Sequence, residues 1–365
     1  MASQMKYSRK PVAIMCFSSG GGGMERSAVR LAHMLSKVAN VVLICKKNSY
    51  VEKLYCEVAE NFPCESVDFT SRVFSPLMLI RARHLVNKYN IGNVIFMGAS
   101  ELKTLFFSFL GLKINMIVWH GTTKSKPKRD FIHNLVYSNV NYHVVLSEHL
   151  LRNVKDIVPL TPRAIFRIIR PVPDFEISVS DPGCFTNKII NIIHVGRIAA
   201  GKGQVDAILA CKSLRDAGIK FTLTLVGGVD DVLYMQQVDQ AIYEANLSDV
   251  VHLSGYVNNV KDFLEKADIF LFPSRGEGMP GSLIETLHYN IVCIVYKNTV
   301  FLEFVEMGFN IHLVADGNIA DLSAVLLAVV RNLHTEKEKT TYNIELSRKY
   351  FQVDREISEW LDILV

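Results

Sequence analysis

The sequence predicts an α/β protein of two doubly wound domains, each a parallel sheet covered by helices. Short apolar runs alternate with amphipathic segments, as expected of parallel strands joined by crossover helices. A chain of 365 residues is too long for one ordinary domain. Pro171 and Pro173 fix an extended segment over residues 169–174, where we place the linker. The predicted domains are residues 1–171 and residues 174–349.

The first half contains five short apolar runs that predict strands. They are Val12–Phe17, Val41–Cys45, Val94–Met97, Asn115–Trp119 and Tyr142–Leu146. Helical periodicity between them predicts helices, for example over Met24–Val38 and Leu77–Tyr89.

The second half repeats this alternation and ends in an amphipathic segment, Tyr350–Val365. Its predicted strands are Ile189–Val195, Phe221–Val226, Val250–Leu253, Ile269–Phe272 and Ile291–Tyr296. Its predicted helices are Gln204–Ala217, Asp230–Ala245, Val260–Ala267, Leu283–His288 and Leu322–Leu333. Two such domains are expected to face each other across a cleft at the carboxyl ends of their sheets, where these folds bind ligands.

Charge is unevenly distributed, although the net charge is only +4. Residues 1–172 hold 24 Lys/Arg against 10 Asp/Glu, whereas residues 173–365 hold 16 against 26. The basic half predicts an anionic partner. No zinc-finger spacing or RNP-like motif favours nucleic acid, so we expect an anionic membrane surface or a phosphorylated lipid-linked acceptor. The alternative is a basic surface docked on an acidic neighbouring domain.

Two apolar segments of the basic half are candidates for contact with lipid. Residues 72–88 combine apolar and basic side chains and are the better candidate, unless they form an ordinary helix with a basic outer face. Residues 104–112 are more apolar, but nine residues favour a buried helix.

The cysteine pattern and hydropathy predict a cytoplasmic protein that is at most peripheral to a membrane. The seven cysteines are scattered without a Cys-x-x-Cys pair, which favours buried thiols over disulfides or a zinc site. They are Cys16, Cys45, Cys56, Cys64, Cys184, Cys211 and Cys293. We see neither a secretory signal nor an apolar stretch of about 18 uncharged residues.

The segment Ser274–Glu285 is the most informative of the chain. A Gly/Pro-rich loop carrying Glu277 follows the strand Ile269–Phe272 and runs into a helix whose early turns carry Glu285. A helix start suits an anion such as a diphosphate. Carboxylates on either side can accept hydrogen bonds from sugar hydroxyls, so the pattern favours a sugar nucleotide. The alternative is an acidic loop before a surface helix.

A second loop, His194–Gly203, brings two cations to the end of a strand. Arg197 and Lys202 can stabilise the charge of a departing nucleoside diphosphate. The chain contains no Asp-x-Asp, which disfavours a metal in that role. A solvated basic loop is the alternative.

The glycine run Gly20–Gly23 follows the first strand and opens a helix, where backbone can approach a ligand closely. The Gly-x-Gly-x-x-Gly fingerprint is absent, and the second strand ends in Lys46 and Lys47 in place of an acid. Both facts disfavour a dehydrogenase. A turn without a ligand is the alternative.

Two further strand ends carry candidate residues. His120 ends the strand Asn115–Trp119 and is either a ligand contact or a structural histidine. The segment Gly255–Val257 follows another strand, and its Tyr256 either stacks on a base or packs in a core.

These motifs resemble those of retaining glycosyltransferases with the GT-B fold, especially family 4. The acids Glu277 and Glu285 resemble that family's Glu, seven residues, Glu motif. Gly20–Arg26 resembles its Gly-Gly-x-Glu-Arg, and Gly196–Gly203 resembles its Gly-Arg-x-x-x-x-Lys-Gly. The resemblance implies two Rossmann-like domains, with residues 350–365 packing back onto the N-terminal one.

The resemblance also implies roles for the site residues. Arg197 and Lys202 would hold the diphosphate, Glu285 the ribose, and Glu277 the transferred sugar as a catalytic residue beside His120. Other donor-binding residues would be Gly22, Gly23, Gly255, Tyr256, Val257, Gly278, Met279, Pro280, Gly281 and Ser282. By resemblance we expect same-face attack, with the leaving phosphate taking the acceptor proton; Glu277 as nucleophile is the alternative.

We therefore expect a retaining glycosyltransferase that uses a nucleotide-diphosphate sugar, with UDP as the favoured nucleotide, and neither metal nor cofactor. The acceptor would be a hydroxyl of a lipid-linked or growing glycan in cell-surface polysaccharide or lipopolysaccharide synthesis. The rivals are a sugar-nucleotide epimerase or hydrolase of the same architecture, and a non-catalytic sugar-nucleotide binding subunit.

Overall fold

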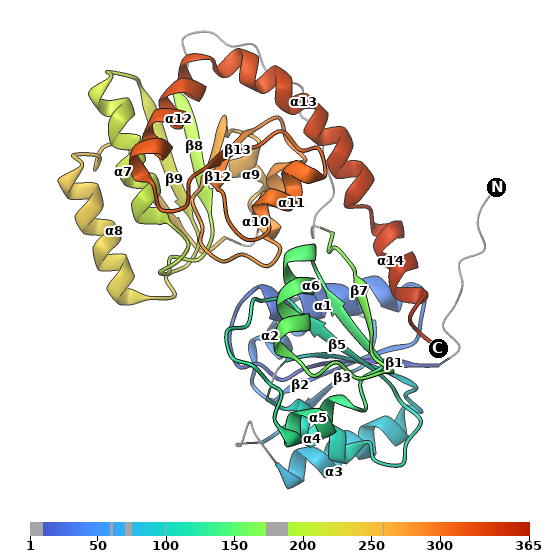
Figure 1. The fold of residues 1–365 in the computed structure, drawn as a ribbon. Coiled ribbons are helices and arrows are strands. Elements are labelled where there is room, and N and C mark those ends of the chain that lie inside the picture. The colour runs from blue at the N-terminus through green and yellow to red at the C-terminus, as the bar shows by residue number, and fades with distance from the viewer. Residues whose placement is uncertain (1–9, 59–60, 70–74, 99, 173–188, 258) are drawn as a thin grey trace. The chain divides into compact units, whose positions relative to one another are not determined.

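A computed structural model describes residues 10–58, 61–69, 75–98, 100–172, 189–257 and 259–365 (Figure 1). The chain divides into two compact units, Met1–Asp174 with Gln352–Val365, and Phe175–Phe351. Part of the expected linker (173–174), the start of the basic stretch (72–74) and Cys184 lie outside the described residues.

The N-terminal unit is built on a parallel sheet that has seven strands in the described residues, in the order β3-β2-β1-β4-β5-β6-β7. The strands are β1 (Val12–Cys16), β2 (Val41–Lys46), β3 (Cys64–Val67), β4 (Asn93–Met97), β5 (Asn115–His120), β6 (Tyr142–Val145) and β7 (Ile165–Ile168). The helices are α1 (Gly23–Ser36), α2 (Tyr50–Val58), α3 (Pro76–Lys88), α4 (Leu102–Ser108), α5 (Phe131–Tyr137), α6 (Glu148–Ile157) and α14 (Val353–Leu361). Figure 1 shows α1 above this sheet and α3, α4 and α5 below it.

Burial explains which strands the sequence predicted. Every residue of β1, β4 and β5 is buried, which is why these central strands read as continuous apolar runs. The edge strands β3 and β7 were missed because they are only partly buried and carry Glu65 and Arg167.

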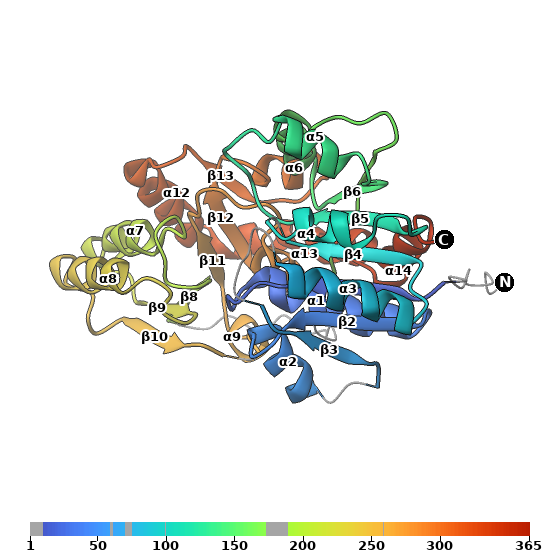
Figure 2. The same cartoon turned by 90° about the horizontal axis from the view of Figure 1, so that it is seen from below.

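The C-terminal unit has a six-stranded parallel sheet over its described residues, in the order β10-β9-β8-β11-β12-β13 (Figure 2). The strands are β8 (Ile190–Val195), β9 (Phe221–Val226), β10 (Val251–Gly255), β11 (Ile269–Phe272), β12 (Val292–Tyr296) and β13 (His312–Val314). The helices are α7 (Gln204–Asp216), α8 (Val232–Glu244), α9 (Lys261–Leu264), α10 (Gly281–Thr286), α11 (Phe301–Glu306), α12 (Ile319–Arg331) and α13 (Leu333–Tyr350). The predicted helix over Val260–Ala267 is shorter than expected, and the three-residue β13 was missed.

Each sheet reverses its strand order once, which fixes where a ligand can bind. The reversal falls between β1 and β4 in the first sheet and between β8 and β11 in the second. Open α/β sheets bind ligands outside the carboxyl ends of the strands at such a switch point. The loops that follow these four strands are therefore the first places to look for a site.

The last helix, α14, is fixed to the N-terminal unit by an ion pair whose carboxylate is buried. The two terminal guanidinium nitrogens of Arg30 donate to the carboxylate of Glu356, at 2.8 and 2.7 Å. The Val172 N–H donates to the same carboxylate at 2.8 Å. Glu356 is 2% exposed and Trp360 on the same helix is 1% exposed. None of the helices in the described segments combines the length and apolar character needed to cross a bilayer.

Glu356→Ala is expected to destabilise the N-terminal unit by about 3–5 kcal/mol, because it leaves the Arg30 guanidinium, whose side chain is only 13% exposed, without its carboxylate. Urea unfolding followed by tryptophan fluorescence measures this, because both tryptophans of the chain, Trp119 and Trp360, belong to this unit. Glu359→Ala is the matched control, since Glu359 pairs with Arg355 on the surface of the same helix and its loss should cost less than about 1 kcal/mol. Equal losses in both variants would contradict the anchoring role.

Candidate functional site

The loops that follow β8 and β11 meet at the switch point of the C-terminal sheet. The Gly201 carbonyl accepts a hydrogen bond from the Arg275 N–H at 2.7 Å, and the Ser274 hydroxyl oxygen lies 3.1 Å from the same carbonyl. Gly203 has φ +79°, and a Cβ added there would lie 2.0 Å from the Pro273 oxygen. Only glycine permits this conformation and this close approach, so the two loops are held together backbone to backbone.

Lys202 and Glu277 join the two loops through their side chains. The Lys202 ammonium contacts the Glu277 carboxylate at 2.6 Å, and the Ser274 hydroxyl donates to the same carboxylate oxygen at 2.5 Å. The side chains are 27% and 12% exposed, so the pair is sheltered but still reached by solvent. The ring of Phe272 lies 6.0 Å from the Lys202 nitrogen. A cation and a carboxylate thus share the carboxyl ends of two adjacent strands.

His194, at the end of β8, holds the backbone of Lys202 by a hydrogen bond. Its Nε2 donates to the Lys202 carbonyl at 2.8 Å, which assigns the proton to that nitrogen. Burial lowers the pKa of His194 to about 4, so the ring is neutral near pH 7. The interpretation of the sequence included His194 in the motif but gave it no role. A histidine within an otherwise apolar strand was the feature that could have indicated one.

Arg197 does not join the Lys202–Glu277 pair. Its guanidinium contacts the carboxylate of Asp230 at 2.5 Å, and both side chains are half exposed. The interpretation of the sequence gave Arg197 and Lys202 one common anion, whereas the structure gives them two different carboxylates. Asp230 follows β9, and nothing in the sequence indicated this pairing.

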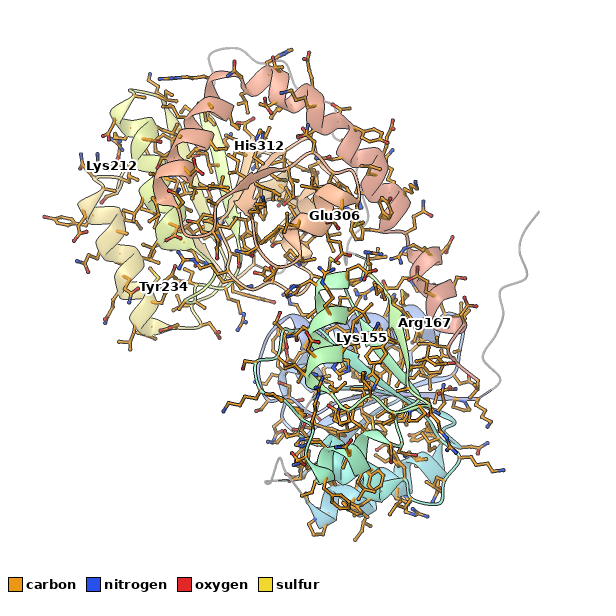
Figure 3. All side chains as sticks on the ribbon, in the orientation of Figure 1. Lys155, Arg167, Lys212, Tyr234, Glu306 and His312 are labelled. Carbon is orange, nitrogen blue, oxygen red and sulfur yellow. The ribbon has the colours of Figure 1, made fainter. Side chains whose placement is uncertain are left out.

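A further network, absent from the sequence interpretation, attaches the β11 loop to the first turn of α7. Asp206 accepts hydrogen bonds from Arg275 at 2.8 Å and from the Tyr296 hydroxyl at 2.8 Å. Burial and the bond to Asp206 raise the pKa of Tyr296. Tyr234 at the start of α8, labelled in Figure 3, accepts from the Val205 N–H at 3.3 Å. These contacts hold the loop in which Glu277 lies.

The rest of the acidic motif leads directly into α10. Gly278, Met279 and Pro280 are buried, and the helix begins at Gly281. Ser282 accepts a bond from Thr286 within the helix. Glu285 lies in this helix and is partly buried.

The segment after β10 presents a tyrosine to solvent. Gly255 has φ +69°, and its carbonyl accepts a bond from the Gly227 N–H at 2.9 Å. Tyr256 is 55% exposed, so the alternative that it packs in a core is wrong. Val257 beside it is partly buried.

In the N-terminal unit the glycine run lies at the other switch point, between β1 and α1. Gly22 is the extended residue before α1, which begins at Gly23. The Gly20 N–H donates to the Ser18 hydroxyl at 3.1 Å, and Gly21 lies against the ring of Tyr50. A Cβ added at Gly23 would meet open space, so this residue leaves room beside the helix start.

His120, at the end of β5, is engaged at both ring nitrogens. Its Nε2 lies 2.9 Å from Nδ1 of His143, and its Nδ1 lies 2.5 Å from the Lys124 ammonium. His120 is 1% exposed, and burial followed by the charge of Lys124 holds its pKa well below the usual range. Burial and the charge of Lys128 lower the pKa of Lys124 to about 7. Contact of His120 with a sugar therefore requires the loss of Lys124 or His143 as its partner.

The neutral His143 is expected to make the N-terminal unit less stable in acid. Burial and the charge of Lys124 lower its pKa to about 3, so between pH 6.5 and 3 the unfolded chain binds a proton that the folded state does not. Stability should fall by about 1.4 kcal/mol per pH unit in this range. Urea unfolding at pH 6 and pH 5 should show a steeper fall in the wild type than in His143→Phe, and identical slopes would contradict the assignment.

Comparison with known proteins shows that part of the chain is similar to glycosyltransferases. Residues 185–345 match a family model described as glycosyl transferases group 1. An amylovoran biosynthesis glycosyltransferase of Erwinia amylovora is 31% identical over 146 residues, 38% of this chain and 35% of the relative. A Campylobacter jejuni N-acetylgalactosamine-N,N'-diacetylbacillosaminyl-diphospho-undecaprenol 4-alpha-N-acetylgalactosaminyltransferase is 23% identical and aligns over 79% of this chain and 81% of its own length.

The fold comparison covers nearly the whole chain. The structure of Anabaena Alr3699/HepE in complex with UDP and glucose has a TM-score of 0.81 and 14% sequence identity, over 97% of this chain and 99% of that one. In the sequence comparison, this chain spans only about a third of the length of the amylovoran biosynthesis glycosyltransferase. The chain is therefore a GT-B-fold protein whose residues 185–345 match the group 1 glycosyl transferases.

Proposed function

We propose that the chain is a retaining glycosyltransferase that moves a sugar from a UDP-sugar to a hydroxyl of a lipid-linked or growing glycan. The observation that carries the proposal is the Lys202–Glu277 pair at the β8–β11 switch point. The family match over residues 185–345 and the polysaccharide-synthesising relatives support it. The neighbour of like fold that holds UDP and glucose supports the choice of donor.

Binding of the donor would break the ion pair between Lys202 and Glu277. The diphosphate attracts the Lys202 ammonium, which frees the Glu277 carboxylate to accept hydrogen bonds from hydroxyls of the transferred sugar. The backbone from Gly278 to Ser282 assists on the sugar side, and Glu285 on the ribose side. Tyr256, exposed beside Gly255 and Val257, supplies a ring face for the base.

The acceptor hydroxyl would attack the anomeric carbon from the same face from which the leaving group departs. The bond between the anomeric carbon and the phosphate oxygen breaks, and a bond from that carbon to the acceptor oxygen forms. The acceptor proton passes to the departing phosphate. Lys202 stabilises the charge that develops there, so the proposal assigns this task to a side chain and not to a metal. Gly22 and Gly23 shape the donor–acceptor contact, and His120 lies beside the transferred sugar once Lys124 or His143 has released it.

The acceptor side of the proposal rests on charge and on one relative. The N-terminal half carries an excess of 14 positive charges, which suits an anionic membrane surface or a phosphorylated acceptor. The Campylobacter jejuni relative is named for a diphospho-undecaprenol-linked acceptor. We accordingly propose a cytoplasmic protein, peripheral at the inner face of a membrane.

The function is tested by incubating the protein with labelled UDP-sugars, with and without an undecaprenyl-diphosphate-linked saccharide. The proposal expects transfer only with the acceptor, and a product with the donor's anomeric configuration by NMR. Acceptor-independent hydrolysis or epimerisation would establish the first rival. Binding of UDP without turnover of any donor would establish the non-catalytic subunit.

Lys202→Ala should lower turnover by about 100-fold or more, because it removes a preorganised donor to the leaving phosphate. The matched control is Lys212→Ala on α7 (labelled in Figure 3), whose partner Asp216 is also a carboxylate but lies on the surface. The control should keep wild-type turnover. Near-normal kcat in Lys202→Ala would remove Lys202 from the mechanism.

Asp230→Asn distinguishes two possibilities for Arg197. If Arg197 must leave Asp230 to bind the diphosphate, the variant should bind UDP more tightly, by up to about fivefold, since a half-exposed pair is worth about 1 kcal/mol or less. Isothermal titration calorimetry measures the change. Weaker binding of UDP by Asp230→Asn would mean that the Arg197–Asp230 pair itself holds the loop in its binding shape.

A further inference from the structure

His143 and Lys124 are the two partners of His120, and His143 is the one that the fold holds in place. His143 is 0% exposed. Its ring lies within 17° of the planes of the Tyr137 and Phe166 rings, with ring centroids 5.7 and 4.8 Å away. Its Nε2 has no hydrogen-bond partner among the described residues, so its side chain depends on the contact with His120. Departure of His143 would leave a cavity and a second unsatisfied nitrogen.

Lys124 lies in the loop between β5 and α5, where its backbone is held independently of its side chain. Its N–H donates to the amide oxygen of Asn153 at 2.8 Å, and the amide nitrogen of Asn153 donates to its carbonyl at 2.9 Å. Asn153 belongs to α6, which fixes this point of the loop. The side chain beyond it is a flexible four-carbon stem. Lys124 can therefore release His120 without any movement of the backbone.

The Lys124 ammonium is a partly buried cation that forms no ion pair with the residues that the structure describes. Burial, followed by the charge of Lys128, lowers its pKa to about 7. The titratable groups beside it, His120 and His143, are both neutral because burial lowers their pKa values as well. A phosphate offers the ammonium a hydrogen bond between opposite charges, which is stronger than one to a neutral imidazole. A phosphate within reach would therefore draw Lys124 away from His120.

The contact with Lys124 also fixes which nitrogen of His120 carries the proton. An ammonium can only donate, so Nδ1 of His120 accepts the hydrogen bond. Because the ring is neutral, its proton lies on Nε2, which donates to Nδ1 of His143. Once Lys124 leaves, Nδ1 of His120 presents a lone pair. A sugar hydroxyl can donate to that nitrogen.

We propose that Lys124 acts as a gate on His120. Its ammonium covers Nδ1 until a phosphate group of a substrate draws it away, and Nδ1 then accepts a hydrogen bond from a hydroxyl of the sugar. The inference rests on the proposed sugar transfer and makes Lys124 a positioning residue for His120. The C-terminal unit has a parallel arrangement, in which Lys202 covers Glu277.

Nitrogen-15 NMR of histidine-labelled protein at about pH 6, below the pKa of Lys124, observes the gate directly. The resonance of each ring nitrogen reports its proton and its hydrogen bonds, and the His120→Gln variant identifies the resonances of His120. In the free wild type we expect a proton on Nε2 and none on Nδ1. A bound substrate should shift the Nδ1 resonance. Lys124→Met should shift it without any ligand, whereas Lys124→Arg, which still donates, should resemble the wild type.

Two ligands separate the possible sources of the phosphate. A shift on addition of UDP alone would show that the diphosphate of the donor opens the gate. A shift with an undecaprenyl-diphosphate-linked saccharide alone would assign the opening to the acceptor. Either outcome supports the gate.

Steady-state kinetics supply a second readout. Lys124→Met should raise the KM of the substrate that opens the gate by about tenfold, because the phosphate loses a hydrogen bond between charges. The kcat should stay close to the wild-type value, since the gate opens before transfer. Lys124→Arg should recover most of the KM. The matched control is Lys126→Met, an exposed lysine of the same loop, which should keep wild-type constants.

Three results would overturn the gate. One is a proton on Nδ1 of His120 in the free wild type. Another is an unchanged His120 resonance in the presence of both substrates. The third is a fall in the kcat of Lys124→Met with an unchanged KM. Any of these in a protein that still transfers sugar would leave the transferase proposal standing. A UDP-sugar that shifts the resonance in a protein without transfer would contradict the transferase and keep the gate.

Discussion

The contact between Lys202 and Glu277 at the carboxyl ends of β8 and β11 is the interaction on which the rest of the site depends. The two strands are adjacent in the sheet although they are far apart in the chain, so each loop brings one charge to a common point. Glycine at position 203 lets the loops touch, and the neutral His194 holds the lysine backbone. Loss of any of these supports is expected to shift the Lys202 ammonium relative to the Glu277 carboxylate.

The sequence predicted the interior of the fold better than its edges, for a physical reason. Buried central strands such as β1 and β11 must be apolar on both faces, which leaves a plain signal. The edge strands β3 and β7 carry charges and β13 has only three residues, so these three gave no such signal. Within the site, the motifs named Lys202 and Glu277, and the structure brings these two side chains into contact. The partners Asp230 and Asp206 depend on which loops meet in space, and spacing along the chain does not contain that information.

Burial gives neighbouring basic groups of the N-terminal unit different states. The row Lys124–His120–His143 is withdrawn from solvent, and desolvation makes its members easier to deprotonate. Burial also lowers the pKa of Lys128, and the charge of the nearby Lys103 adds to this effect. The charge counted along the sequence does not reveal which basic groups are desolvated, because burial depends on the fold.

A crystal structure of the protein with bound UDP tests the central claim most directly. The account predicts an oxygen of the diphosphate within about 3 Å of the Lys202 ammonium, with Glu277 released from its present contact. A complex in which the diphosphate lies elsewhere, while Lys202 stays paired with Glu277, would contradict it.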